Sequence, residues 1–448
     1  MSTAMVAAPL EAQAARAVPS SAPVRRPNVV LLLADDLGYQ DLSVQGATDI
    51  PTPNIDRIAK DGVRFTQAYV VSPLCSASRG AIMTGRYPMR WGQEFNPGVA
   101  SGPDSAFGIP HDVPILSERL KSLGYATAIF GKWHLGSSQH EVPTARGFDA
   151  FYGFLTAQHY YSNAWWAFPV RHVEHGTDLE RAPPFLTGAL ADAAVSFIDQ
   201  HAQEPFFVYV PFNAVHEPIT TDPVGAPLIH GVKDPVRRAY ATMVSGMDVA
   251  VGRILAALEQ RGLTDHTLVI FLSDNGGPHS TGARNEPLRG VKGQMMEGGI
   301  RVPMVMKWPG MLPPRVDFPQ VVSALDLVPT IMAAVGNPVH ADVDGVDLLP
   351  FLQAAGPFNR APHDTLYWRL GPERAIRAGH WKALWNSGRL ATLTDLSADL
   401  GETRNLQATY PDTLARLHEG YARWEAQMQP PKWGVHAFRA DRVTEAEH

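Results

Sequence analysis

The chain has 448 residues, of which 45% are hydrophobic and 18% are charged, a balance that is typical of a globular protein. Its formal net charge is −6 and it has no basic tract, which argues against a nucleic acid as the main partner because phosphate binding needs clustered Lys and Arg. No run reaches the ~18 apolar residues of a membrane-spanning helix, and one cysteine excludes an internal disulfide.

The first 25 residues are rich in alanine and have no regular hydrophobic pattern. Residues 12–17 (AQAARA) are similar to the end of a signal peptide, but the segment before them is short and contains Glu11. We expect residues 1–25 to be a disordered extension or a signal remnant. The location stays open: periplasmic or secreted if a signal is missing from the start, and cytoplasmic otherwise.

Apolar runs and helical patterns alternate over residues 26–356. Strands are predicted at Asn28–Ala34 and at residues 126–130, 206–210, 267–272 and 302–306. Helices are predicted at residues 54–60, 115–123, 188–201, 236–261 and 325–335. This alternation predicts a large α/β domain with a mostly parallel sheet sandwiched by helices.

The pattern changes after residue 356. Short strands are predicted at residues 365–369, 375–377, 381–385 and 390–396, and one helix at residues 410–427. Residues 357–448 are therefore expected to form a smaller α+β subdomain, in which a helix covers an antiparallel sheet.

Two predicted strands end in residues with oxygen-bearing side chains. Asp35 and Asp36 follow the first strand, and Asp274 and Asn275 follow the strand at residues 267–272. The ends of parallel strands are where open α/β sheets bind ligands. Each pair alone is also typical of a turn. Together, four oxygen ligands favour a hard divalent cation, Ca²⁺ or Mg²⁺.

The only cysteine, Cys75, lies just before a predicted helix and near Arg79. A lone cysteine is more often a small buried hydrophobic residue than a catalyst. A helix N-terminus and an arginine nevertheless both favour an anion, so the residues alone allow an activated thiolate at position 75.

Residues 75–79 (CSASR) resemble the sulfatase signature, Cys-x-Pro-x-Arg or Cys-x-Ala-x-Arg, and residues 80–88 resemble its extension. Further segments match the family in the same order: 27–38 (PNVVLLLADDLG), 131–136 (GKWHLG), 215–218 (VHEP), 273–277 (SDNGG) and 288–301 (LRGVKGQMMEGGIR). The resemblance covers roughly residues 27–309. By pattern it is nearest to arylsulfatases of the N-acetylgalactosamine-4-sulfatase type, which share the His-Glu-Pro and Pro-Leu-Arg-Gly features.

This resemblance implies an alkaline-phosphatase-like fold and a hydrolase of sulfate monoesters, aryl sulfates or sulfated sugars. It implies that Cys75 is oxidised to formylglycine by a formylglycine-generating or radical maturation enzyme, and Ala77, where proline is commoner, leaves open which one. The hydrated aldehyde attacks sulfur, the alcohol leaves, and the second hydroxyl then helps to expel sulfate. The implied metal is Ca²⁺, with Mg²⁺ as the alternative, and its implied ligands are Asp35, Asp36, residue 75, Asp274 and Asn275.

Five further residues enter the site by the same resemblance. His134 is expected to be the base that assists the diol, and His216 the proton donor to the leaving group, with help from Lys292. Arg79 and Lys132 are expected to hold the diol and the sulfate oxygens.

Three alternatives stay open at this point. The first is a phosphonate monoester or phosphodiester hydrolase on the same scaffold, and the second is a sulfated-glycan binding protein with unconverted Cys75. The third uses Cys75 as an ordinary thiol nucleophile. An aromatic stretch is a candidate for stacking on a sugar ring: His159, Tyr160, Tyr161, Trp165 and Trp166.

Overall fold

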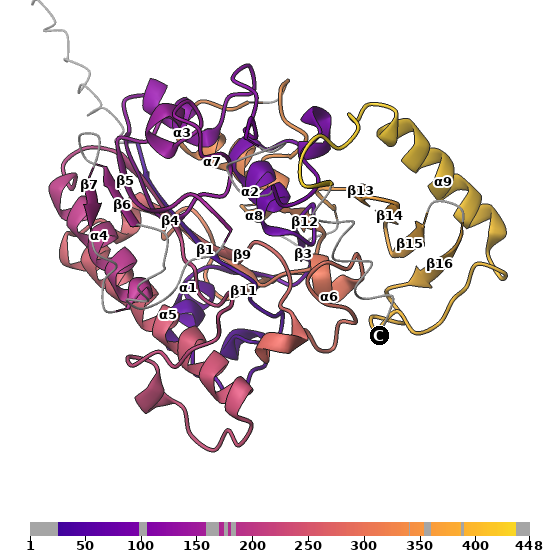
Figure 1. The fold of residues 1–448 in the computed structure, drawn as a ribbon, viewed down its shortest axis with the longest axis horizontal. Helices are drawn as coiled ribbons and strands as arrows, with labels where there is room; N and C mark the ends of the chain where they lie inside the picture. Colours follow the sequence, from indigo (N-terminus) through magenta and orange to yellow (C-terminus); the bar gives the residue numbers. More distant parts are fainter. Residues whose placement is uncertain are drawn as a thin grey trace, which may run out of the picture.

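The computed structural model describes residues 26–97, 105–157, 170–173, 178–180, 185–339, 341–353, 360–386 and 389–435. Its main element is a mixed sheet in the order β11-β2-β10-β9-β1-β8-β4-β5-β6-β7 (Figure 1). The strands are β1 (Asn28–Ala34), β2 (Val63–Phe65), β4 (Ala126–Lys132), β5 (Ala150–Phe154), β6 (Val170–Val173), β7 (Asp178–Glu180), β8 (Phe206–Pro211), β9 (Thr267–Ser273), β10 (Met304–Lys307) and β11 (Val316–Phe318).

Strand β1 lies at the centre of the sheet, and all seven of its residues are buried. It pairs in parallel with β8 on one side and with β9 on the other. The register sets Ala34 beside Ser273, so the chain leaves both strands at the same edge. The carboxylates of Asp35 and Asp274 are therefore brought together by strand pairing alone.

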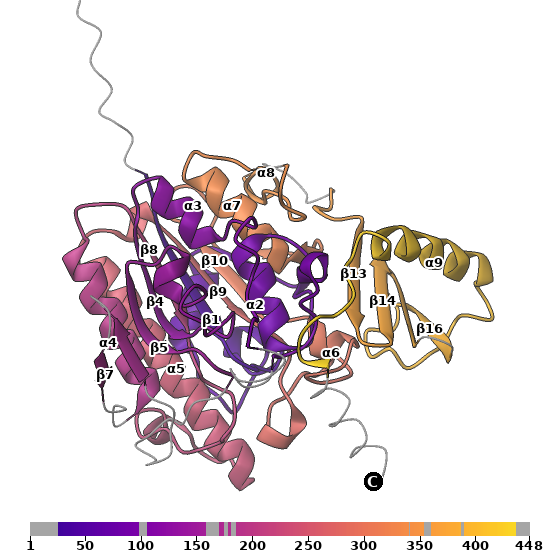
Figure 2. The same ribbon diagram turned by 45° about the horizontal axis from the view of Figure 1, so that its top comes forward.

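Helices cover both faces of the sheet, as Figure 2 shows. Alternate residues of β1 point to opposite faces, because side chains along a strand alternate. On one face lie α1 (Pro53–Lys60), α4 (Leu186–Gln200) and α5 (Pro235–Gln260), and on the other lie α2 (Cys75–Thr84), α3 (Leu116–Ser122), α7 (Leu327–Ala334) and α8 (Leu349–Leu352). Helix α5 is long and apolar enough to cross a membrane, but 78% of its apolar window is buried in the protein, as in a core helix.

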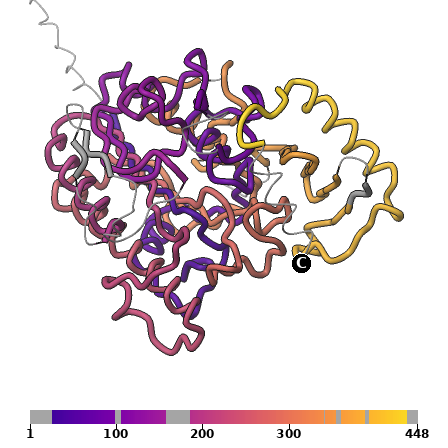
Figure 3. The backbone as a smooth tube through the Cα atoms, viewed as in Figure 1, coloured from indigo at the N-terminus to yellow at the C-terminus, as the bar shows by residue number. Residues whose placement is uncertain are grey.

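The C-terminal part forms a separate lobe, drawn in orange and yellow in Figure 3. Four antiparallel strands, β13 (Thr365–Leu370), β14 (Glu373–Ala378), β15 (Trp381–Asn386) and β16 (Arg389–Asp395), form its sheet. Helix α9 (Pro411–Glu425) packs on one face, through Leu417 and Tyr421. The other face contacts the large domain, where the indole of Trp368 donates to the carbonyl of Val70 at 2.7 Å.

The predicted fold class is confirmed: a mostly parallel α/β sheet between helices, with a smaller antiparallel sheet after it. The strand predicted at residues 302–306 is β10, and it runs antiparallel to β9. The short strands β2, β3 (Ala68–Tyr69), β5, β6, β7, β11 and β12 (Val322–Ser323) were not predicted. The division of the chain into residues 1–25, 26–356 and 357–448 stays a prediction.

Candidate active site

All the residues predicted for the site meet at one edge of the large sheet. They come from six segments: the chain after β1, the first turns of α2, the end of β4, and the loops after β8, after β9 and before α6 (Glu297–Ile300). The side chain of Lys292 is 19% exposed and the others are nearly or wholly buried. The residues are Asp35, Asp36, Cys75, Arg79, Lys132, His134, His216, Asp274, Asn275 and Lys292.

Cys75 lies between the first two carboxylates. Its thiol donates to Asp35 Oδ1 at 3.5 Å and to Asp36 Oδ1 at 3.7 Å. One ligand atom each from Asp35, Asp36, Cys75 and His216 lie within 4.8 Å of one another. Asp36 has a φ of 64°, in the left-handed region that Asp tolerates better than most residues, and this turns its side chain back to the site.

The second oxygen pair lies against the first. The backbone N–H of Asp36 donates to Asp274 Oδ1 at 3.2 Å, and Asn275 Nδ2 donates to Asp36 Oδ1 at 2.7 Å. The buried Oδ1 of Asn275 has no hydrogen-bond partner within the described part of the chain. Three buried carboxylates and an unsatisfied amide oxygen are the donor set of a hard cation, so these residues fit a divalent metal.

Positive side chains face each carboxylate. Lys132 Nζ lies 2.7 Å from Asp35 Oδ2, and Lys292 Nζ lies 2.7 Å from Asp36 Oδ2. Burial alone would raise the pKa of Asp36, but Lys292, His216 and Lys132 outweigh it and hold the pKa well below its usual range. Asp36 is therefore ionised at neutral pH.

Arg79 joins three parts of the site. Its Nε donates to Asp274 Oδ2 at 2.9 Å, its Nη2 lies 2.8 Å from the same oxygen, and its Nη1 donates to the carbonyl of Lys132 at 3.0 Å. Burial, together with the charge of Asp35, still raises the pKa of Asp274 to about 6. The guanidinium is thus needed to keep this carboxyl ionised.

Burial keeps both histidines neutral. Burial lowers the pKa of His216 to about 4, although Asp36 opposes this. Its Nδ1 donates to the carbonyl of Glu217 at 2.7 Å, and its Nε2 lies 3.1 Å from Lys292 Nζ. Burial, and then the charge of Lys132, lowers the pKa of His134 well below 6.5. Neither ring nitrogen of His134 has a hydrogen-bond partner among the residues that the structure describes.

The thiolate allowed by the sequence is not supported. Burial raises the pKa of the Cys75 thiol far above its usual value, despite the charges of Lys132 and Lys292. The helix N-terminus and Arg79 were expected to lower the pKa of the thiol, but burial, together with the charges of Asp274 and Asp35, outweighs them. An unmodified Cys75 is therefore a poor nucleophile here, which argues against the ordinary thiol mechanism.

Two residues that support the first turn of α2 were not predicted from the sequence. Asn96 Oδ1 accepts from the backbone N–H of Ser76, and Gln93 Nε2 donates to the Ser76 carbonyl, so both fix the first turn of α2. Neither lies in a recognisable motif.

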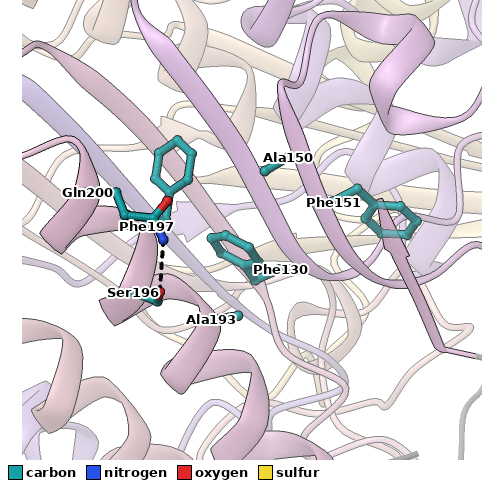
Figure 4. Close-up of a pocket in the computed structure, with 7 residues that line it drawn as sticks. All are labelled: Phe130, Ala150, Phe151, Ala193, Ser196, Phe197 and Gln200. Carbon is teal, nitrogen blue, oxygen red and sulfur yellow. Dashed lines mark hydrogen bonds between the residues drawn. The ribbon is translucent and has the colours of Figure 1, made fainter. Parts of the chain in front are cut away.

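A small hollow between α4, β4 and β5 is lined by Phe130, Phe151 and Phe197 (Figure 4). Its lining has no charged residue, so it offers nothing to an anion.

Buried oxygen ligands surrounded by lysine, arginine and histidine, at the edge of an α/β sheet, are typical of hydrolases that act on anionic esters with a metal ion. The sequence model of the family described as Sulfatase matches residues 27–337, and that of N-sulphoglucosamine sulphohydrolase, C-terminal, matches residues 291–423. The chain belongs to the sulfatase family. It is a sulfatase, an enzyme that hydrolyses sulfate esters, and a metal and a formylglycine are typical of this family.

The sequence similarity between this chain and its relatives extends over most of each chain. Arylsulfatase A of Homo sapiens is 35% identical over 391 residues, covering 80% of this chain and 75% of the relative. N-acetylgalactosamine-6-sulfatase of Rattus norvegicus is 34% identical, covering 80% and 71%. The solved structure of Ps i-CgsB in complex with k-i-k-neocarrahexaose is 34% identical, with a TM-score of 0.86 and coverage of 94% and 97%. Phosphonate monoester hydrolase of Agrobacterium radiobacter, at 21% identity and a TM-score of 0.65, shares the fold.

Proposed function

We propose that this sulfatase removes sulfate from sulfated saccharides, with a formylglycine made from Cys75 and a Ca²⁺ ion beside it. The observation that carries the proposal is the position of Cys75, which lies between Asp35 and Asp36 while Lys132 and Lys292 contact the same carboxylates. Residue 75 therefore lies beside both the proposed cation site and the two lysines, whose positive charge suits a sulfate group.

The cation would be held by Asp35, Asp36, Asp274 and Asn275, with residue 75 beside them. Oxygen ligands favour Ca²⁺ over softer metals, and Mg²⁺ is the alternative. When bound, the cation supplies positive charge that stabilises the sulfuryl group as the S–O bond breaks. The hydrated formylglycine supplies the attacking hydroxyl.

The side chains divide the remaining work. Lys132 and Arg79 orient the hydroxyls of residue 75 and the sulfate oxygens, because each of them contacts Asp35, whose carboxylate lies beside Cys75. His134 is the base for the diol, since it is neutral and its ring nitrogens lack partners among the described residues. His216 is the proton donor to the leaving oxygen, and because the one proton of its neutral ring is on Nδ1, the proton that Nε2 passes on comes from the ammonium of Lys292, 3.1 Å away.

Sulfated saccharides are the proposed substrate class. Their support is the likeness to a structure solved with a neocarrahexaose and to N-acetylgalactosamine-6-sulfatase. The aromatic stretch at residues 159–166 lies outside the described residues, so its stacking on a sugar stays a prediction. The maturation enzyme stays a prediction as well, and Ala77 does not identify it.

The test compares esters that differ in the transferred group. We expect a higher kcat/KM for p-nitrophenyl sulfate than for phenyl phosphonate esters, and still higher values for defined sulfated oligosaccharides. A higher kcat/KM on the phosphonate would favour the phosphonate monoester or phosphodiester hydrolase. A Cys75→Ala variant that keeps the protein's full function would instead favour the sulfated-glycan binding protein.

A further inference from the structure

A buried cluster of charges joins the C-terminal sheet to the segment that follows Lys292. Lys382, on β15, is 1% exposed, and its Nζ lies 3.0 Å from Glu297 Oε1 and 3.0 Å from Glu402 Oε1. Glu297 is fully buried, and Glu402 Oε2 accepts from its backbone N–H at 2.6 Å. One ammonium group therefore holds two carboxylates from different segments of the chain.

Glu297 is the first residue of α6, and α6 contacts the loop that bears Lys292. The backbone N–H of Gly298 donates to the carbonyl of Arg289 at 2.7 Å, which closes residues 289–298 into a loop. A Cβ on Gly298 would lie 2.2 Å from the carbonyl oxygen of Gly290. The two backbones are thus in direct contact, and a shift of α6 would move the loop of Lys292 with it.

The same helix contacts the second oxygen pair. Gly276, directly after Asn275, donates its N–H to the carbonyl of Gly299 at 3.1 Å. A Cβ on Gly276 would lie 1.8 Å from the carbonyl oxygen of Gly298. No side chain separates α6 from this loop, so the position of Asn275 also depends on where Glu297 is held.

The C-terminal sheet also contacts Tyr69 and Val70, a few residues before Cys75 in the chain. Trp368 donates to the Val70 carbonyl, and the Arg377 guanidinium lies 5.0 Å from the ring centre of Tyr69. The hydroxyl of Tyr69 in turn donates to Glu297 Oε2. The sheet therefore contacts chain segments on both sides of the site.

We propose that Lys382 is a positioning residue of the active site: by holding Glu297 and Glu402, it fixes α6 and, through α6, the loop of Lys292. The inference rests on the role given to Lys292 under the proposed function. Lys382 does not contact the reacting groups, so its effect on the reaction is indirect. We place that effect on Lys292; an effect that passed through Asn275 instead would be equal with and without Lys292.

A double-mutant cycle tests this coupling. We expect Lys382→Met to lower kcat/KM for p-nitrophenyl sulfate at least ~10-fold in the otherwise wild-type enzyme, and less than ~3-fold when Lys292→Ala is already present. Lys382→Arg should recover part of the activity. A merely structural role would lower activity by the same factor in both backgrounds, and that result would overturn the proposal.

Arg369→Met is the matched control. Arg369 is also a buried cation of the C-terminal sheet, and its Nε lies 2.9 Å from the buried carboxylate of Glu94. Coupling of this variant to Lys292→Ala as strong as that of Lys382→Met would also refute the proposal. If Lys382→Met does not fold, Glu402→Gln enters the same cycle. Full activity of Lys292→Ala alone would refute the role of Lys292, a failure distinct from additive losses.

Discussion

Removal of the Arg79 guanidinium should damage both stability and metal binding. Arg79 is fully buried and makes three close contacts, two with Asp274 and one with the carbonyl of Lys132. Arg79→Met leaves the carboxylate of Asp274 buried without its closest cation. Loss of one partner of a buried charge pair costs about 3–5 kcal/mol, so we expect the free energy of unfolding to fall by that amount.

Metal affinity should fall with it. The pKa of Asp274 is already raised to about 6 by burial, and without Arg79 it would rise further, so the carboxyl would be protonated at neutral pH. Loss of a partner that orients a ligand typically weakens metal binding about 10–100-fold. Arg79→Lys keeps the positive charge but loses the paired N–H donors of the guanidinium, so its metal affinity should lie between those of Arg79→Met and the wild type.

Urea denaturation and calcium titration by calorimetry measure the two effects. The control is Arg90→Met, because Arg90 also forks one carboxylate, Asp344, but at a half-buried position outside the site. Its stability should fall less and its calcium affinity should not change. A wild-type urea midpoint and wild-type calcium affinity in Arg79→Met would refute the reasoning.

Further outcomes follow from other contacts. Cys75→Ala should lower kcat by about 10⁴-fold or more with an unchanged urea midpoint, and retained turnover would exclude residue 75 as the nucleophile. Calcium at 100 times its Kd should stabilise the wild type by about 2.7 kcal/mol, and Asp36→Asn should abolish this shift in thermal scans; an equal shift in the variant would show binding elsewhere. Burial lowers the pKa of His363, but Asp326, 2.7 Å away, outweighs this and raises it above 6.5. Its stabilising effect is therefore complete below pH 6.5 and is lost as the pH rises through the folded-state value. His363→Gln should remove that part of the pH dependence, and identical profiles in denaturation at pH 6–9 would contradict it.

The local sequence was enough to predict an element where one strong signal, such as a continuous apolar run, determines the structure. The run at Asn28–Ala34 is apolar throughout, and β1 has these bounds because it is buried on both faces. The pairing of β1 with β9 then explains why Asp35 and Asp274 meet. The lysines and histidines proposed for the site were predicted through a family resemblance, because a lone lysine or histidine has no local signature.

Other features depend on contacts that the sequence does not encode locally. Glu297 and Lys382 are 85 residues apart, and a charged residue in a short strand is normally expected at the surface. Their burial follows from the docking of one sheet on another. The raised pKa of Cys75 also depends on surroundings, since its local neighbours alone favoured the opposite shift.

Residue 75 is proposed to act as an aldehyde among these charges. Peptide mass spectrometry of the active enzyme tests it most directly, with turnover of p-nitrophenyl sulfate measured on the same sample. We predict a peptide lighter than the cysteine form by about 18 Da, in a fraction that scales with kcat across preparations. Full turnover from a preparation in which residue 75 is entirely a free thiol would show that no aldehyde is needed.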